Sequence, residues 1–222
     1  MEISMTAAEY ESVMAPPSQE ITPDQYFEYM AEVYRRNEIV CAGGLEQLRR
    51  IVRREKRSVL VVPKRPAQMK LPVLIGKLTF GGKQLYNQND LHFLVDIVPT
   101  PEHHYVLAGV DDGRTPFFFS PGDPTSWSKQ DRSPFTWWES YCLVLCFGNS
   151  IPHLWERMGL GNLYGAGSKA VRPPGEYMYV PCFANFSRKK EFHKPRFTTS
   201  TGGFVGGETL LGVPTCKGRV VE

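Results

Sequence analysis

Two cysteines, Cys142 and Cys146, have the spacing at which side chains share one face of a helix. Thiolates are preferred ligands of Zn²⁺, so this pair could begin a zinc site that other residues complete. The other candidate ligands are Cys182, Cys216, His153 and His193. The pair lies in an apolar run, where cysteine usually behaves as a small buried hydrophobe, and the chain has no Cys-x-x-Cys motif. We therefore expect no bound metal and no cofactor, with Cys142 and Cys146 as the candidate ligands to examine.

A cysteine activated by a histidine is the second chemistry that the residues allow. Cys182 and Cys216 stand alone near the ends of expected strands, and His193 is the candidate base. Glycine-rich turns at 159–167 and 201–209 could instead line a phosphate site. Neither turn is followed by the helix that a phosphate-binding loop requires, so hairpin turns explain them better. A small hydrolase or transferase with a Cys-His or Gly-lined site is therefore the alternative function.

Basic residues form two clusters, at 49–57 and 187–197. In the first cluster, three arginines repeat at helical spacing and could follow phosphates or dock an acidic partner. In the second, phenylalanines alternate with basic residues, which suits base stacking. The candidate contact residues are Arg49, Arg53, Arg57, Lys189 and Arg196. Because the net charge is only +3, a solvated helix face is preferred, and nucleic-acid binding is the second alternative.

Trp137 and Trp138 are adjacent on an expected helix, so their side chains must point in different directions. We expect one of them to be buried and the other to lie nearer to the surface. Exposed tryptophans often anchor partners, so both residues are candidates for ligand or partner binding.

Local signals predict the elements that position these residues. A helix over 23–36 follows from Thr22 as N-cap, Pro23 at the first helical position and Gln25 three residues after the cap. Further elements are helices over 45–57, over 89–98 and from Ser133-Pro134 to about Phe147, and strands over 58–63 and 104–113.

The segments after Phe147 are short, rich in aromatic and β-branched residues, and separated by Gly or Pro. Helices therefore concentrate in the N-terminal and central parts, and strands follow them. We predict an α+β fold with a mainly antiparallel C-terminal sheet. Pro16 and Pro17 interrupt any early helix, so we expect residues 1–20 to be an arm or linker and residues 21–222 to be a single domain.

The composition restricts the class of protein. With 222 residues and 41% hydrophobic content, the chain can form one substantial core. No apolar run approaches the about 20 residues that span a bilayer, and the acidic N-terminus lacks a signal-peptide pattern. Five cysteines without framework spacing indicate reduced thiols. We expect a cytoplasmic protein without membrane contacts, and a homodimer is possible through exchange of the N-terminal arm.

Four short segments, in order along the chain, resemble the pattern of the DUF5701 family of bacterial proteins of unknown function. They are YVLAGVDDG (105–113), DRSPFTWWE (131–139), GAGSK (165–169) and LLGVPTCKGR (210–219). Two departures stand out, because Lys169 replaces an arginine and FTTSTGGFVGG (197–207) replaces a tryptophan-rich segment. The resemblance implies a bacterial intracellular domain and transfers no catalytic residue. We expect a binding or interaction module in preference to an enzyme.

Overall fold

The computed structural model describes residues 22–39, 44–55, 58–66, 71–80, 83–84, 86–87, 94–113, 115–119, 131–147, 162–170, 178–185, 197–204, 208–210 and 212–221. The arm or linker expected over residues 1–20 lies outside the described residues. Among those described, no helix has the length and apolar character needed to cross a membrane. The described part combines helices with largely antiparallel sheets, which confirms the predicted α+β class.

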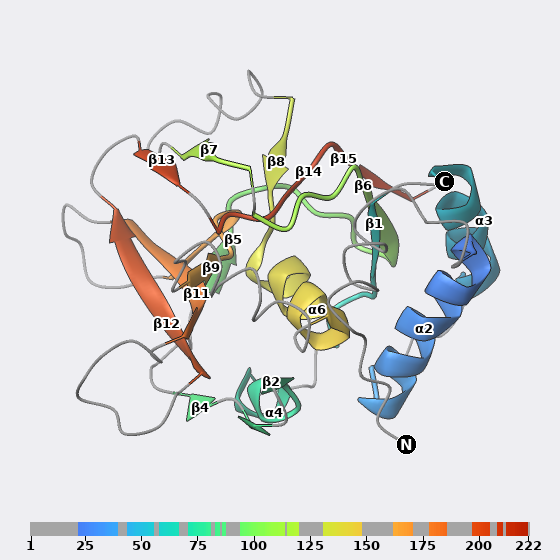
Figure 1. Cartoon of the computed structure of the whole chain (residues 1–222), viewed down its shortest axis with the longest axis horizontal. Coiled ribbons are helices and arrows are strands. Elements are labelled where there is room, and N and C mark those ends of the chain that lie inside the picture. Colours follow the sequence, from blue (N-terminus) through green and yellow to red (C-terminus); the bar gives the residue numbers. More distant parts are fainter. Residues whose placement is uncertain are drawn as a thin grey trace.

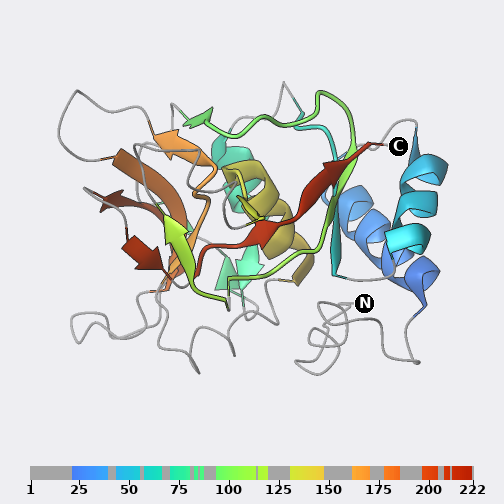
Figure 2. The same ribbon diagram turned by 90° about the horizontal axis from the view of Figure 1, so that it is seen from above.

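The elements form successive layers, which Figures 1 and 2 show from two directions. Helices α2 (Pro23–Arg36) and α3 (Leu45–Glu55) lie at one end of the molecule. Next to them is a sheet of β1 (Val59–Val62), β6 (Tyr105–Ala108) and β15 (Gly218–Val220). Helix α6 (Trp137–Phe147) separates this sheet from a second, larger sheet built mainly from the C-terminal part. The main hydrophobic core lies where α2, α3, α6, β1 and β6 meet.

Helix α2 begins and ends where the sequence predicts. The Thr22 side chain accepts a hydrogen bond from the Gln25 amide, and the Gln25 side chain accepts one from the Thr22 amide. This capping box satisfies two backbone donors at the start of the helix. Helix α3 begins at Leu45 as predicted but ends at Glu55, and residues 56 and 57 lie outside the described residues.

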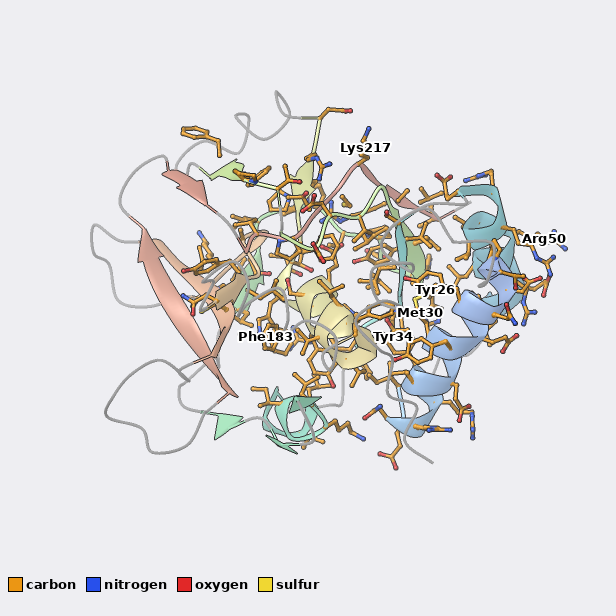
Figure 3. The ribbon with its side chains drawn as sticks, viewed as in Figure 1. Tyr26, Met30, Tyr34, Arg50, Phe183 and Lys217 are labelled. Atoms are coloured by element: carbon orange, nitrogen blue, oxygen red, sulfur yellow. The ribbon has the colours of Figure 1, made fainter. Side chains whose placement is uncertain are left out.

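The β1 strand is an edge of its sheet, and α2 covers that edge. The Tyr26 hydroxyl donates to the Val59 carbonyl and the Tyr34 hydroxyl donates to the Val61 carbonyl, at 2.5 Å each. Between them, the Val61 amide donates to the Met30 sulfur at 3.5 Å. Figure 3 shows these three α2 side chains side by side, facing the core. Side chains of a helix therefore satisfy backbone groups that a further strand would otherwise pair with.

Helix α6 ends at Phe147 as predicted, but the prediction of its start was wrong. Ser133 and Pro134 form β8, which pairs with β14 (Thr215–Cys216). The N-cap is Thr136, whose Oγ1 accepts from the Glu139 amide at 3.2 Å while the Glu139 Oε2 accepts from the Thr136 amide at 2.7 Å. A Thr-x-x-Glu capping box was thus the start signal, and Ser133-Pro134 lies in a strand before it.

The second sheet has the strand order β4 (Tyr86–Asn87), β12 (Phe197–Phe204), β11 (Met178–Asn185), β10 (Ser168–Ala170) and β5 (Leu94–Asp96), and β9 (Asn162–Tyr164) also pairs with β11. All its pairs are antiparallel except β4 with β12. The helix predicted over 89–98 was wrong over 94–98, because residues 94–96 pair with β10 as strand β5, and residues 89–93 lie outside the described residues. Pairing with a distant strand overrode the local helical pattern.

The remaining elements are short. They are α4 (Leu71–Gly76), β2 (Thr79–Phe80) paired with β3 (Lys83–Gln84), and β7 (Phe117–Phe119) paired with β13 (Glu208–Leu210).

Helix α6 connects the two larger sheets by its aromatic side chains. Trp137 stacks on Tyr141 and on Phe183 of β11, with ring centroids 5.5 and 6.0 Å apart.

Candidate functional site

The polar network at the start of α6 centres on the Glu139 carboxylate, which is completely buried. Arg219 of β15 binds it with both Nε and Nη2, at 2.7 and 2.8 Å. The Tyr105 hydroxyl of β6 donates to the same carboxylate at 2.9 Å, and the Thr136 amide completes the set. Each carboxylate oxygen thus accepts two hydrogen bonds, which is its full capacity. The carboxylate has no lone pair left for a substrate.

Arg219 extends this network to β8. Its Nη1 donates to the Ser133 hydroxyl at 2.8 Å, and its Nη2 donates to the Pro134 carbonyl at 3.1 Å. Burial disfavours the charge on Arg219, but the Glu139 carboxylate more than offsets burial and holds the pKa of the guanidinium above its usual value. Burial, together with Glu139, also raises the pKa of Tyr105. The Arg219–Glu139 pair is a bidentate, charge-assisted clamp that joins β15 to α6.

The Gly165–Lys169 segment packs tightly against the same helix start. The Gly167 amide donates to the Phe135 carbonyl at 2.7 Å. A Cβ added at Gly167 would lie 2.8 Å from the Pro134 carbonyl oxygen, so only glycine fits this close approach. The Ser168 hydroxyl accepts from the Trp137 amide and donates to the Asp96 carboxylate of β5. These bonds join β5 and β10 to the first turn of α6.

The Asp-Asp-Gly turn after β6 is held by the Asp111 carboxylate. It accepts from the Gly113 amide at 2.9 Å and from the amide and hydroxyl of Thr115. Arg132 lies 3.4 Å from the same carboxylate and donates to the Thr215 hydroxyl. The turn therefore has a structural role, as its sequence indicates.

The four segments that carry the family resemblance, 105–113, 131–139, 165–169 and 210–219, thus meet around the start of α6. They lie far apart in sequence, and hydrogen bonds join each of them to another or to α6. Their polar groups bind one another. We interpret this network as the framework of the fold.

The structure describes four of the five cysteines. Cys142, Cys146, Cys182 and Cys216 are all buried and are not joined in disulfides. Burial raises the pKa of the Cys216 thiol to about 12, so this thiol is protonated at neutral pH. Among the described residues, no group of three or more His, Cys, Asp or Glu could hold a metal ion. His153 and His193 lie outside the described residues.

The expectation that one of the two adjacent tryptophans lies nearer to the surface was wrong. Trp137 is 1% exposed and Trp138 is 5% exposed. Trp138 donates from Nε1 to the Pro63 carbonyl at 2.7 Å and stacks on Tyr141. Both rings are buried because α6 lies between two sheets and is covered on opposite sides.

Two arginines of α3, Arg49 and Arg53, bind the neighbouring helix α2. Arg53 forms a bidentate ion pair with Asp24, at 2.7 and 2.9 Å, and Arg49 pairs with Glu28. Arg50 points outward from α3 in Figure 3. Asp24 and Glu28 are four residues apart, as are Arg49 and Arg53, so the matching charge spacing could have indicated this pairing from the sequence. Arg57, Lys189 and Arg196 lie outside the described residues.

A groove of about 410 Å³ lies between the C-terminal half of α2 and the start of α3. Sequence reasoning did not identify it. Its apolar lining comes from Ala31, Ile39 and Leu45, and its charged lining from Glu28, Glu32, Arg35 and Glu38. Leu45 is 40% exposed, whereas Ile39 is almost fully buried. A partly exposed apolar surface with charged borders is typical of a polypeptide-binding site.

Glu32 and Glu38 remain ionised at neutral pH. Hydrogen bonds from Arg35 and Arg36 lower the pKa of Glu32, and a hydrogen bond from Lys77 lowers the pKa of Glu38. Arg49 binds Glu28 as well, so the charged border of the groove consists of ion pairs within the chain.

Searches with this chain find no matching protein-family model, no matching curated protein and no matching solved structure. The resemblance to DUF5701 accordingly stays a prediction from four short segments, and the function must be inferred from the geometry of the chain itself.

Proposed function

We propose that this protein is an interaction module that binds a polypeptide segment in the groove between α2 and α3. The observation that carries this proposal is the combination, in one groove of about 410 Å³, of an apolar lining with charged borders. Leu45 is the exposed apolar contact of this groove and Ile39 is the buried one. A partner would place one apolar side chain between them, as in the helix-in-groove mode of recognition.

The ion pairs on the border of the groove define the partner further. Three carboxylates and one guanidinium line the groove, and cations of the same chain bind each of the carboxylates. The border therefore offers charged groups of both signs to the polar face of a partner. We propose an amphipathic polypeptide as the occupant.

The alternative functions receive less support. A Cys-His hydrolase or transferase requires a reactive thiol, whereas Cys182 and Cys216 are buried and the pKa of Cys216 is raised. Nucleic-acid binding through the first basic cluster requires unpaired arginines, whereas Arg49 and Arg53 bind carboxylates of α2. We also propose a reducing, cytoplasmic setting, which the free state of the described cysteines supports.

Peptide selection tests the proposal. A library of random displayed peptides would be selected on the intact protein, and the affinity of single peptides would be measured by calorimetry. We expect the selected peptides to share an apolar anchor flanked by polar residues. Leu45→Asp should weaken their binding about tenfold or more, since one apolar contact contributes about 1.5 kcal/mol. Val73→Asp is the matched control, because Val73 is 52% exposed on α4 and does not line the groove. Peptides that bind both variants equally would contradict the proposal.

A further inference from the structure

Glu38 follows the last turn of α2 in a backbone conformation that is unusual for its residue type. Its φ is 57°, in the left-handed region, where a side chain is disfavoured and glycine is the common residue. Of the six described residues with a positive φ, four are glycines and the fifth is Asp131, a residue type that tolerates this region. Glu38 is therefore the exception, and its conformation lowers the stability of the fold.

Hydrogen bonds hold Glu38 in this conformation. The Glu38 amide donates to the Arg35 carbonyl at 3.1 Å. The Ile39 amide donates to the Tyr34 carbonyl at 2.9 Å. These two bonds form the Schellman motif that commonly ends a helix, with Glu38 at the position that glycine usually occupies. The backbone here thus requires a left-handed residue, but it does not require glutamate.

The Glu38 side chain contributes little to stability. Its Oε2 accepts a hydrogen bond from Lys77 of α4 at 2.9 Å, and the side chain is 81% exposed. An ion pair this exposed is weak, because water screens the charges and two long side chains lose freedom. Among the described residues the carboxylate has no other partner, so its Oε1 is free to accept a hydrogen bond from another molecule.

Glu38 lies at one end of the groove between α2 and α3. On the α2 side, the residues that line the groove extend from Glu28 to Glu38, which is about 15 Å along a helix. Ile39, the buried apolar contact of the groove, is the next residue in the chain. A partner whose apolar anchor reaches Ile39 therefore brings its neighbouring backbone close to the Glu38 carboxylate.

The local charge decides which donor suits Glu38. Arg35 and Arg36 both bind Glu32. Lys77 binds Glu38, so this end of the groove carries three cations and two carboxylates. A further cation from a partner would meet a net positive charge. Backbone amides at the start of a helix are a better match, because they have no partner within that helix and carry only partial charge.

We propose that Glu38 caps the first turn of a helix bound in the groove and so sets the direction in which the partner binds, an inference that rests on the proposed function. The partner is an amphipathic helix whose own sequence lacks an N-cap residue. Its first turn lies at Glu38, and its chain then runs back along α2 towards Glu28. The reverse direction would place unpaired carbonyl groups of the partner against the Glu38 carboxylate, where acceptors would face each other.

Thermal unfolding and peptide affinity should change in opposite directions in one variant of the full chain. Glu38→Gly removes the left-handed penalty and should raise Tm by about 2–4 °C. It also removes the acceptor and should weaken binding of the displayed peptides selected on the groove about fivefold. Glu38→Ala keeps the penalty, so it should weaken binding equally without raising Tm. Lys77→Met is the matched control, because it removes the ion pair, keeps the acceptor and should not weaken binding.

A nitroxide label at one end of a selected peptide reads the direction of binding. A label at the N-terminal end should broaden the NMR signals of the Glu38 and Ile39 amides. A label at the C-terminal end should instead broaden the signal of the Glu28 amide. A serine placed as N-cap in the peptide should reduce the effect of Glu38→Gly, because the peptide then supplies its own acceptor.

The outcomes separate the capping role from the proposed function. If Leu45→Asp weakens the peptides but Glu38→Gly does not, the groove binds polypeptides and the capping role of Glu38 is wrong. If no selected peptide depends on Leu45, the proposed function fails and the capping role fails with it. A Tm that does not rise in Glu38→Gly would show that the conformation of Glu38 carries no cost. Labels that give the reverse pattern would overturn the direction of binding.

Discussion

The two edges of the β1–β6–β15 sheet differ in how their backbone groups are treated. At the β1 edge, Tyr26, Met30 and Tyr34 of α2 bind the outward groups and exclude other strands. At the β15 edge, the outward groups of Arg219 have no described partner, although its side chain is bound to Glu139. One edge is thus closed by a helix, and at the other the backbone of Arg219 has no partner among the described residues. In the described part of the chain, protection of an edge by helix side chains is therefore seen at β1 and not at β15.

The largest expected effect on stability comes from breaking the ion pair between Arg219 and Glu139, which joins β15 to α6. Arg219→Met removes the partner of a fully buried carboxylate, which should cost about 3–5 kcal/mol in the free energy of unfolding. Urea denaturation followed by fluorescence measures this loss. Lys217→Met is the control, since Lys217 is an exposed cation close to β15. A loss for Arg219→Met that is no larger than the control would show that the clamp does not hold the strand.

Removing the tyrosine hydroxyl groups that bind the β1 edge should have an intermediate effect on the free energy of unfolding. Tyr34→Phe leaves the buried Val61 carbonyl without its hydroxyl donor, and Tyr26→Phe does the same to the Val59 carbonyl. Each change should reduce the free energy of unfolding by about 1–3 kcal/mol. Tyr29→Phe is the comparison, because the Tyr29 hydroxyl bonds to the Cys146 carbonyl on α6 and lies only partly buried. Chemical denaturation should rank Tyr29→Phe as the mildest of the three, and any other order would contradict this account of the β1 edge.

The smallest effect concerns the ion pair that holds α3 beside α2. The hydrogen bond from Arg53 lowers the pKa of Asp24 below its ordinary value. A lowered pKa means that the folded state favours the carboxylate, so its stabilisation is present at neutral pH and is lost as the pH falls through the folded pKa. Asp24→Asn should therefore lower Tm slightly at pH 7 and leave it unchanged well below pH about 3.

The effect of Asp24→Asn should also shrink in high salt, because the pair is exposed. Glu102→Gln, at another exposed carboxylate, provides the control. An Asp24→Asn effect that is the same at acid and neutral pH would assign it to something other than the ion pair.

Local signals predicted the elements that depend on neighbouring residues. The capping box of Thr22 and Gln25 gave both the start and the type of α2. The same type of signal at Thr136 and Glu139 was present in the sequence, but Ser133-Pro134 resembled a helix start more obviously. Residues 94–96 form a strand because of β10, which is about 70 residues away, and no local pattern contains that information.

The candidate sites were harder to predict for the same physical reason. Glu139 and Arg219 are 80 residues apart, and only folding brings them together. Arg49 and Arg53 resembled a free basic face until α2 was placed beside them. The groove depends on the angle between two helices, and that angle is set by packing against the sheet. Residue types therefore indicated which chemistry was possible, whereas tertiary contacts decided which side chains can still bind a ligand or partner.

The tyrosines of α2 have a consequence for how far any assembly of this protein can grow. A sheet with two free edges can add copies at both ends without limit, and such growth leads to fibrils. Here every copy has one edge blocked by its own helix. A strand of another chain therefore cannot add to this sheet beside β1. Two hydroxyl groups and a thioether thereby prevent growth of this sheet from its β1 edge.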